Sequence, residues 1–191
     1  ALALIRHVML ASRGSDTYQD MADTLARDEA ARSPHVVAAF RAVDRAQFLP
    51  ADARADAYID SPARSGVFHQ SSPSIYAAAL EALDLGGARR RSFLNIGSGT
   101  GYFSALCATA AAHAGGELSP HVGIERHAEL TTWARARTTD VFYDVGDVFE
   151  HRRIVGSSLR TCVLQPCHNL LTAHGRHADV LHTAPDGVDE A

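Results

Sequence analysis

A glycine-rich turn in the middle of the chain constrains the fold more than any other stretch. Residues 93–106 read FLNIGSGTGYFSAL, in which a short apolar run leads into three alternating glycines and then into helix-forming residues. Gly97, Gly99 and Gly101 omit side chains where the backbone must turn tightly or meet a ligand closely. The stretch therefore predicts a short strand, a glycine turn and the start of a helix.

Segments of strand and helix character alternate from this turn onward. The expected strands are RSFLNIG, HVGIE, VFYDVGD and HADVLHTAP, and the expected helices between the first three are TGYFSALCATAAA and RHAELTTWARAR. The stretch from residue 150 to residue 176 is weakly patterned, and we leave it unassigned. Alternating strands and helices indicate βαβ units and hence an α/β fold with a parallel sheet.

The region before the turn is expected to be mostly helical. Residues 15–31 begin with capping residues, and Ser33-Pro34 starts a second helix. Residues 48–68 are rich in Pro, Asp and Gly, which predicts an ordered loop. Ser72-Pro73 opens a further helix that Gly86-Gly87 can end.

Composition favours a globular protein and argues against two kinds of partner. Hydrophobic residues make up 46% of the 191 residues and charged residues 21%, which is an ordinary balance. The net charge of -4 gives no support for a nucleic-acid-binding surface. No apolar run reaches the roughly 18 residues that a membrane span needs.

Cysteine usage and the first residues bear on the compartment. Cys107, Cys162 and Cys167 are odd in number and do not suggest a disulfide framework, so a reducing, cytoplasmic compartment is expected. The opening ALALIRHVMLASR is basic and free of acids, and we expect it to form an ordinary first helix. The alternative is the remnant of a presequence, with a mitochondrial matrix or other organellar location. The spacing from Cys162 to Cys167-His168 fits no common zinc pattern, so no metal site is expected.

Candidate ligand-binding residues fall at the ends of three successive strands, where open α/β sheets bind ligands. Beside the glycine turn, Glu125 ends the second strand, where a carboxylate can accept both hydroxyls of a ribose. Asp147 ends the third strand, where a carboxylate can meet an adenine amino group. Either residue could also be an ordinary strand-end or turn residue. The G-x-G-x-G spacing differs from that of dinucleotide binders and lacks the Lys-Ser/Thr of a phosphate loop.

The order of these motifs resembles the protein-L-isoaspartate O-methyltransferase family, whose members use S-adenosylmethionine on a class I, Rossmann-like sheet. The resemblance runs from about Val36 to Asp147 through VVAAFRAVDRAQFLP, AYIDSP, HQSSPSIYAAALEAL, FLNIGSGTGY and VGIERHAEL. The glycine turn and HQSSPSIYAAALEAL are most similar to the branch of isoaspartyl-methyltransferase-domain-containing proteins. We therefore expect an N-terminal helical extension and loop over 1–70 and a methyltransferase-like Rossmann domain over 71–191.

The resemblance implies a role for each candidate residue. Gly97, Gly99 and Gly101 would line the methionine part of S-adenosylmethionine. Asn95 and Ser98 are further cofactor-binding positions, and Asn95 would lie near the cofactor's ammonium group. Glu125 would hold the ribose, and Asp147 would lie near the adenine. Ser71 matches the family's active-site serine beside the substrate carboxylate, although Ser71 and Ser72 at a helix N-terminus would equally suit plain capping.

The implied reaction needs few specialised side chains. A carboxylate is already ionised at pH 7, so its methylation requires no strong base. Catalysis would consist mainly of positioning the reactants and excluding water. The implied partner is a protein substrate that carries an isoaspartyl residue.

Two departures from the family pattern open an alternative. Asn95 stands where active members carry a glutamate, which removes a carboxylate near the cofactor's ammonium group and is expected to weaken binding. HADVLHTAP resembles the family's fourth strand, and the sequence ends soon afterwards, so we expect a sheet that is truncated there and has an open edge. Three explanations stay open for this edge: a natural chain that continues past Ala191, a dimer formed through the edge, or other protein partners that cover it. The function is therefore either isoaspartyl-repair methyl transfer or that of a non-catalytic structural or adaptor subunit of a larger assembly.

Overall fold

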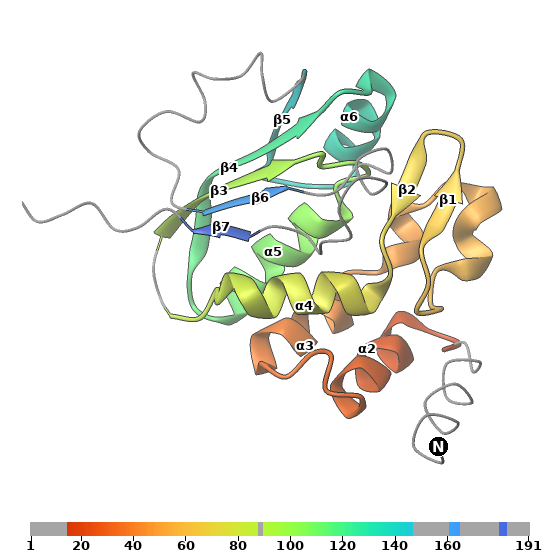
Figure 1. The fold of residues 1–191 in the computed structure, drawn as a ribbon, viewed down its shortest axis with the longest axis vertical. Coiled ribbons are helices and arrows are strands. Elements are labelled where there is room, and N and C mark those ends of the chain that lie inside the picture. Colours follow the sequence, from red (N-terminus) through yellow and green to blue (C-terminus); the bar gives the residue numbers. More distant parts are fainter. Residues whose placement is uncertain (1–14, 88–89, 147–160, 165–179, 183–191) are drawn as a thin grey trace, which may run out of the picture.

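A five-stranded sheet carries the fold in the computed structural model, which describes residues 15–87, 90–146, 161–164 and 180–182 (Figure 1). Its strands are β3 (Arg90–Ile96), β4 (Glu117–Glu125), β5 (Phe142–Val145), β6 (Thr161–Leu164) and β7 (Val180–His182). They lie in the order β5-β4-β3-β6-β7. The first four pair in parallel, and β7 pairs antiparallel with β6. The predicted α/β class with a parallel sheet is confirmed.

The strands after β5 differ from the expectation. The fourth strand of this sheet in chain order is β6, which lies in the stretch that sequence patterning left unassigned. β7 lies within HADVLHTAP and forms an edge of the sheet, but it is the fifth strand of the sheet and runs antiparallel. Placing the fourth strand at HADVLHTAP was therefore wrong. Strands of three or four residues are too short for periodicity to identify them.

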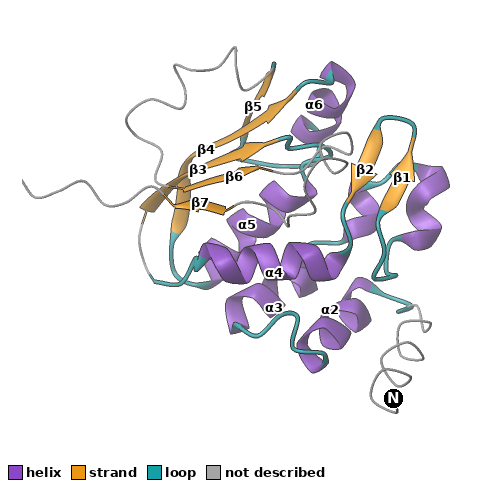
Figure 2. Cartoon of the chain, in the orientation of Figure 1, coloured by secondary structure: helices purple, strands orange, loops and turns teal. Residues whose placement is uncertain are grey.

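Helices cover one face of this sheet. Helices α4 (Pro73–Leu83) and α5 (Tyr102–His113) lie along it, and α2 (Tyr18–Arg27) and α3 (Pro34–Ala42) lie beneath them (Figure 2). Helix α6 (Ala128–Arg135) connects β4 to β5.

One apolar core joins the N-terminal helices to the sheet. Its fully buried members include Phe40 of α3, Leu80 of α4, Phe93 of β3 and Leu106 of α5. Alternation along β3 places Leu94 in a second cluster with other strand residues. The helices before residue 70 therefore share their core with the helices and strands that follow. The division of the chain at residue 70 stays a prediction.

The segment predicted to be a loop carries regular structure, so that prediction was wrong in part. It begins as the 3-10 helix η1 (Arg45–Phe48) ends, and it holds the 3-10 helix η2 (Ala51–Asp56) and strand β1 (Ala63–Ser65). At its end β1 pairs in a hairpin with β2 (Phe68–Gln70). Gly66 in the hairpin turn has φ of 54°, a conformation that favours glycine. Three-residue strands among Pro, Asp and Gly give no readable alternation.

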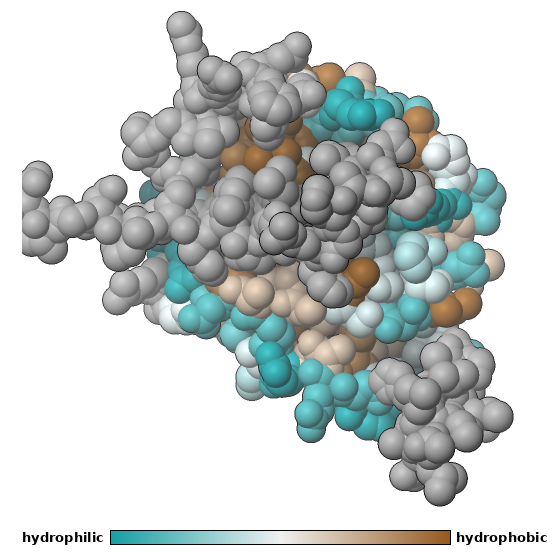
Figure 3. Space-filling view, viewed as in Figure 1, coloured by the Kyte–Doolittle hydropathy of each residue, from teal (hydrophilic) through white to brown (hydrophobic). Residues whose placement is uncertain are grey.

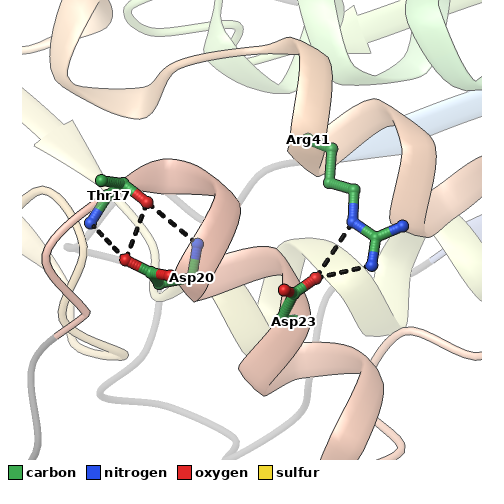
Figure 4. A network of polar contacts seen from close by, with 4 residues as sticks. All are labelled: Thr17, Asp20, Asp23 and Arg41. Carbon is green, nitrogen blue, oxygen red and sulfur yellow. Dashed lines mark hydrogen bonds and ion pairs between the residues drawn. The ribbon is translucent and has the colours of Figure 1, made fainter.

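Local capping sets the ends of the helices. Thr17 and Asp20 form a capping box at the start of α2, and Asp23 pairs with Arg41 of α3 at 2.6 Å (Figure 4). Figure 3 shows a largely hydrophilic surface over α2 and α3. The ion pair itself is exposed, and exposed pairs contribute little stability. Helix α4 begins at Pro73 as predicted, but its C-cap is Asp84 in a left-handed conformation, not the predicted glycine pair.

Two sequence predictions cannot be placed in this fold. ALALIRHVMLASR precedes the described residues, so its expected helix and its possible targeting role stay predictions. Among the helices that the structure describes, none has the length and apolar character to cross a membrane.

Glu81 of α4 caps the start of α3. Its carboxylate accepts hydrogen bonds from the backbone amides of Arg32 and Ser33 and from Ser33 Oγ, each at 2.7 Å. Burial raises the pKa of Glu81, but these hydrogen bonds outweigh burial, and the pKa lies below its ordinary value. The ionised carboxylate thus ties α4 to α3.

We expect Glu81→Gln to lower the free energy of unfolding at pH 7 by about 1–2 kcal/mol, because the amide has one acceptor oxygen and no charge. The carboxylate's contribution is full above its unfolded-state pKa of about 4.3 and is lost as the pH falls through the lower folded-state value. Urea denaturation at pH 7 and at about pH 3.5 should therefore show a smaller difference between the proteins in acid.

Glu117→Gln is the control for this change, because Glu117 is exposed and, among the described residues, its ion pair is a surface contact with Arg90. It should alter stability by less than about 0.5 kcal/mol. An equal difference between wild type and Glu81→Gln at both pH values would contradict the capping role.

Gly123 of β4 lies where no side chain fits. A Cβ atom there would lie 2.5 Å from Tyr143 Cδ1 and 3.0 Å from Ser98 Cβ. Tyr143 is 1% exposed, so its ring cannot swing into solvent to make room. The ring of Tyr143 in β5 therefore packs directly across the backbone of β4 at Gly123.

We expect Gly123→Ala to destabilise the protein by about 2–3 kcal/mol through overpacking. Gly86→Ala is the matched control, since its new Cβ would meet no atom closer than 3.6 Å. Thermal unfolding followed by circular dichroism measures both. Equal melting temperatures for the two variants would show that the packing of Tyr143 does not require a glycine at position 123.

Candidate functional site

The glycine turn joins the carboxyl end of β3 to the first turn of α5, as predicted. Gly97, Gly99 and Gly101 have φ values of 72°, 56° and 84°, in the left-handed region that strains other residues. The amides of Gly97 and Ser98 both donate to the carbonyl of Ile124 in β4, at 2.8 and 3.0 Å. These bonds fix the turn against the end of the neighbouring strand.

The glycines of the turn differ in what their missing side chains permit. A Cβ on Gly101 would lie 2.8 Å from Tyr143 Oη and 2.9 Å from Ala134 Cβ, so this glycine makes room for α6 and β5. A Cβ on Gly99 would meet only ordinary contacts, the nearest being the carbonyl oxygen of His69 at 3.7 Å. Gly99 is thus required by its backbone conformation, whereas Gly101 is also required by packing.

Glu125 ends β4 with its carboxylate directed at the turn. Its Oε2 accepts from the amide of Gly99 at 2.9 Å, and its Oε1 accepts from the amide of His127 at 3.0 Å. The residue is 3% exposed. Each carboxylate oxygen has two lone pairs, so each can accept one further hydrogen bond. Glu125 therefore orders the turn and retains acceptor capacity beside it.

Asn95 lies on the face of β3 that packs against α5. Its Nδ2 donates to Ser104 Oγ of α5 at 3.0 Å, and the residue has no exposed surface. Within the described ranges, Asn95 Oδ1 and Ser98 Oγ are buried and have no hydrogen-bond partner. Buried polar atoms without partners are costly and therefore rare, and here one lies near the end of β3 and the other in the glycine turn.

A buried polar network continues from Asn95 beneath the turn. Ser104 hydrogen-bonds to Tyr143, and Thr138 Oγ1 contacts Tyr143 Oη at 3.3 Å. Burial raises the pKa of Tyr143, and the hydrogen bonds with Thr138 and Ser104 act in the opposite direction. No sequence pattern indicated this network, because its members come from four separate segments and match no short motif.

Ser71 lies between β2 and α4, close to the glycine turn. Its amide donates to Tyr76 Oη at 3.0 Å. The preceding residue, Gln70, donates from Nε2 to Thr100 Oγ1 at 3.0 Å, and Thr100 belongs to the turn. The end of the hairpin and the end of β3 therefore meet, and Ser71 stands at that junction.

The alternative role of Ser71 and Ser72, capping the N-terminus of α4 with their side chains, does not match the structure. The N-cap of α4 is Ser72, and its side chain makes no capping hydrogen bond. Asp60 caps this helix instead, since its Oδ1 accepts from the amide of Ser74 at 2.8 Å. Ser71 precedes the cap.

Aromatic residues close the same end of the sheet. Phe68 of β2 packs edge-on against Trp133 of α6, with ring centroids 4.8 Å apart. Trp133 Nε1 donates to the carbonyl of Phe48 at 3.2 Å. The structure thus gathers Ser71, the glycine turn and Glu125 at the carboxyl ends of the parallel strands, where Figure 1 shows the β1–β2 hairpin beside α6.

The remaining candidates fall elsewhere. Asp147, Cys167 and His168 lie outside the described residues, and of Cys162 only the strand backbone is described. Cys107 is a buried free thiol, and burial raises its pKa. In the part of the chain that the structure describes, no group of three or more His, Cys, Asp or Glu side chains gathers as a metal site would require.

Relatives of the chain are methyltransferases. It is 39% identical over 121 residues to a protein-L-isoaspartate O-methyltransferase of Rhodopseudomonas palustris (strain ATCC BAA-98 / CGA009), covering 62% of this chain and 50% of the relative. It is 35% identical over 124 residues to one of Koribacter versatilis, covering 64% and 52%. The chain thus spans about half the length of these relatives.

Solved structures share the fold. A Plasmodium falciparum chain, described as a protein-L-isoaspartate O-methyltransferase in complex with S-adenosyl-L-homocysteine, superposes with a TM-score of 0.62 at 15% identity, covering 90% of this chain and 97% of that one. Another protein-L-isoaspartate O-methyltransferase gives 0.56 at 22% identity, covering 68% and 42%. At these identities the likeness establishes the fold alone.

The sequence also matches a family as a whole. The model of the protein-L-isoaspartate(D-aspartate) O-methyltransferase family matches residues 16–148. This range includes the N-terminal helices, the hairpin, the glycine turn and Glu125. Because the match extends over more than half of the sequence, the chain belongs to the protein-L-isoaspartate(D-aspartate) O-methyltransferase family.

Proposed function

We propose that the chain is an S-adenosylmethionine-dependent carboxyl O-methyltransferase that acts on isoaspartyl residues of damaged proteins. The observation that carries this proposal is the junction of Ser71, the glycine turn and Glu125 at the carboxyl ends of the strands. Membership of the family supports the reaction class. The relative from Plasmodium falciparum, described in complex with S-adenosyl-L-homocysteine, supports the choice of cofactor.

The described residues fit this cofactor. Among the described residues, each oxygen of the Glu125 carboxylate accepts one hydrogen bond and can accept another, which suits the two hydroxyls of a ribose. Ser98 Oγ is a buried polar atom that lacks a partner among the described residues. Gly97 and Gly99 leave the backbone of the turn open to close approach. Asn95 would support the turn from beneath through its hydrogen bond to Ser104. Asp147 is proposed to lie near the adenine.

The chain's own residues would then orient the substrate. When bound, S-adenosylmethionine supplies a methyl group on a sulfonium. The isoaspartyl carboxylate is ionised at pH 7 and needs no base. The Ser71 hydroxyl is proposed to donate a hydrogen bond to it, next to the positive end of the α4 dipole. Phe68 and Trp133 would help to exclude water from this end of the sheet.

A non-catalytic, methyltransferase-like structural or adaptor subunit is the second candidate, and Asn95 favours it. Asn95 brings no negative charge to the site, and its amide donates to Ser104. A subunit of this kind would keep the pocket and lack turnover. The two candidate functions therefore share the fold and differ in whether the chain catalyses methyl transfer.

We expect calorimetry to detect binding of S-adenosylhomocysteine to the purified chain, and Glu125→Gln to weaken it about tenfold, because a charged acceptor becomes a neutral amide. Glu129→Gln on the exposed start of α6 is the control and should leave the affinity unchanged. Absence of heat at millimolar ligand with wild type would refute the cofactor assignment. Equal affinities of the two variants would refute the role of Glu125.

We expect wild type to methylate an isoaspartyl peptide and Ser71→Ala to reduce kcat by about 100-fold through lost orientation of the carboxylate. Radiolabelled methyl transfer measures both. Ser74→Ala, in the first turn of the same helix, should retain most of the activity. Binding of the cofactor without any transfer by wild type would reject the enzyme and support the second candidate.

A further inference from the structure

Arg45 is an arginine without exposed surface whose hydrogen bonds, among the described residues, go to no carboxylate. Its guanidinium offers five N–H donors. The acceptors and their distances are Gln70 Oε1 at 3.0 Å and the carbonyl oxygens of Asp56 at 3.4 Å, Ala57 at 3.0 Å, Ile59 at 3.2 Å, Ser61 at 3.0 Å and Ser71 at 3.0 Å. One side chain therefore holds a segment that runs from the end of η2, through the β1–β2 hairpin, to Ser71.

Gln70 extends this arrangement to the glycine turn. Its Oε1 accepts from Arg45 Nε, and its Nε2 donates to the carbonyl of Phe48 and to Thr100 Oγ1, each at 3.0 Å. Gln70 also has no exposed surface. A continuous chain of buried hydrogen bonds thus runs from Arg45 through Gln70 to Thr100.

The two branches from Arg45 end on opposite sides of the junction. One branch ends directly on the carbonyl of Ser71. The other ends on Thr100, next to Gly99 and Gly101. A shift of the guanidinium would therefore move Ser71 relative to the turn, and methyl transfer depends strongly on such alignment.

We propose that Arg45 is a positioning residue that sets the place of Ser71 relative to the glycine turn, acting through the Ser71 carbonyl and through Gln70. This inference rests on the proposed methyl transfer and adds a residue to it. Arg45 does this through the planar, forked arrangement of its guanidinium donors and not through its charge alone. A lysine is a point charge that cannot present donors to all six acceptors.

The test uses Arg45→Lys, which keeps the charge, and Thr100→Val, which removes only the far end of the relay. Arg41→Lys is the control, since Arg41 lies exposed on α3 and its ion pair in the described part of the chain is with Asp23. Hydrogen–deuterium exchange is measured over 56–72, 97–101 and α5. Kinetics with an isoaspartyl peptide and calorimetry with S-adenosylhomocysteine are measured on the same proteins.

We expect Arg45→Lys to speed exchange over 56–72 by about tenfold or more while α5 keeps its protection. Its kcat should fall about 100-fold, with the affinity for S-adenosylhomocysteine changed less than about threefold. Thr100→Val should lower kcat about tenfold at an unchanged melting temperature. If Arg45→Lys does not fold, this variant alone tests the positioning role, and an unchanged kcat would overturn it. Arg41→Lys should match wild type throughout.

Exchange over 56–72 that is equal in Arg45→Lys and Arg41→Lys would overturn the proposal. A kcat that falls only in proportion to the unfolded fraction would overturn it as well. If wild type neither binds the cofactor nor transfers a methyl group, the proposed function fails. The exchange result then still decides whether Arg45 fixes the segment from η2 to Ser71.

Discussion

The attachment of the glycine turn to the end of β4 is the constraint on which the rest of the site depends. Two amides of the turn donate to the carbonyl of Ile124, and a third donates to the carboxylate of Glu125. Because these bonds come from the backbone, they hold the turn in place with few demands on its side chains. Left-handed conformations at the glycines are the geometric requirement for making all of them at once.

Around this attachment the fold supports the site from two directions. Beneath the turn, the network of Asn95, Ser104 and Tyr143 joins β3, α5 and β5. In front of it, Gln70 and Arg45 join the hairpin to Thr100. Both supports are buried and polar, and buried hydrogen bonds specify one arrangement more strictly than apolar contacts do. The site is therefore rigid where the backbone turns and where Ser71 is held.

The sequence predicted what depends on local pattern and missed what depends on distant pairs. The strand, turn and helix around Gly99 and the acid at the end of β4 were predictable, because glycine spacing and strand ends are visible in a few residues. The hairpin and β6 were missed, since strands of three and four residues show no usable period. Arg45 resembled an ordinary surface arginine, and only the tertiary structure surrounds it with carbonyls.

The packing of Tyr143 has a consequence for how this family member can change in evolution. The ring leaves no space for a side chain on Gly123, and its hydroxyl leaves none on Gly101. A mutation at Gly123 is therefore tolerated only after position 143 has acquired a smaller residue, which would also remove a partner of Ser104. Gly101 is held in addition by Ala134 and by its left-handed backbone. The order of substitutions at positions 123 and 143 is constrained, so among homologous sequences these two positions should covary while neighbouring surface positions drift independently.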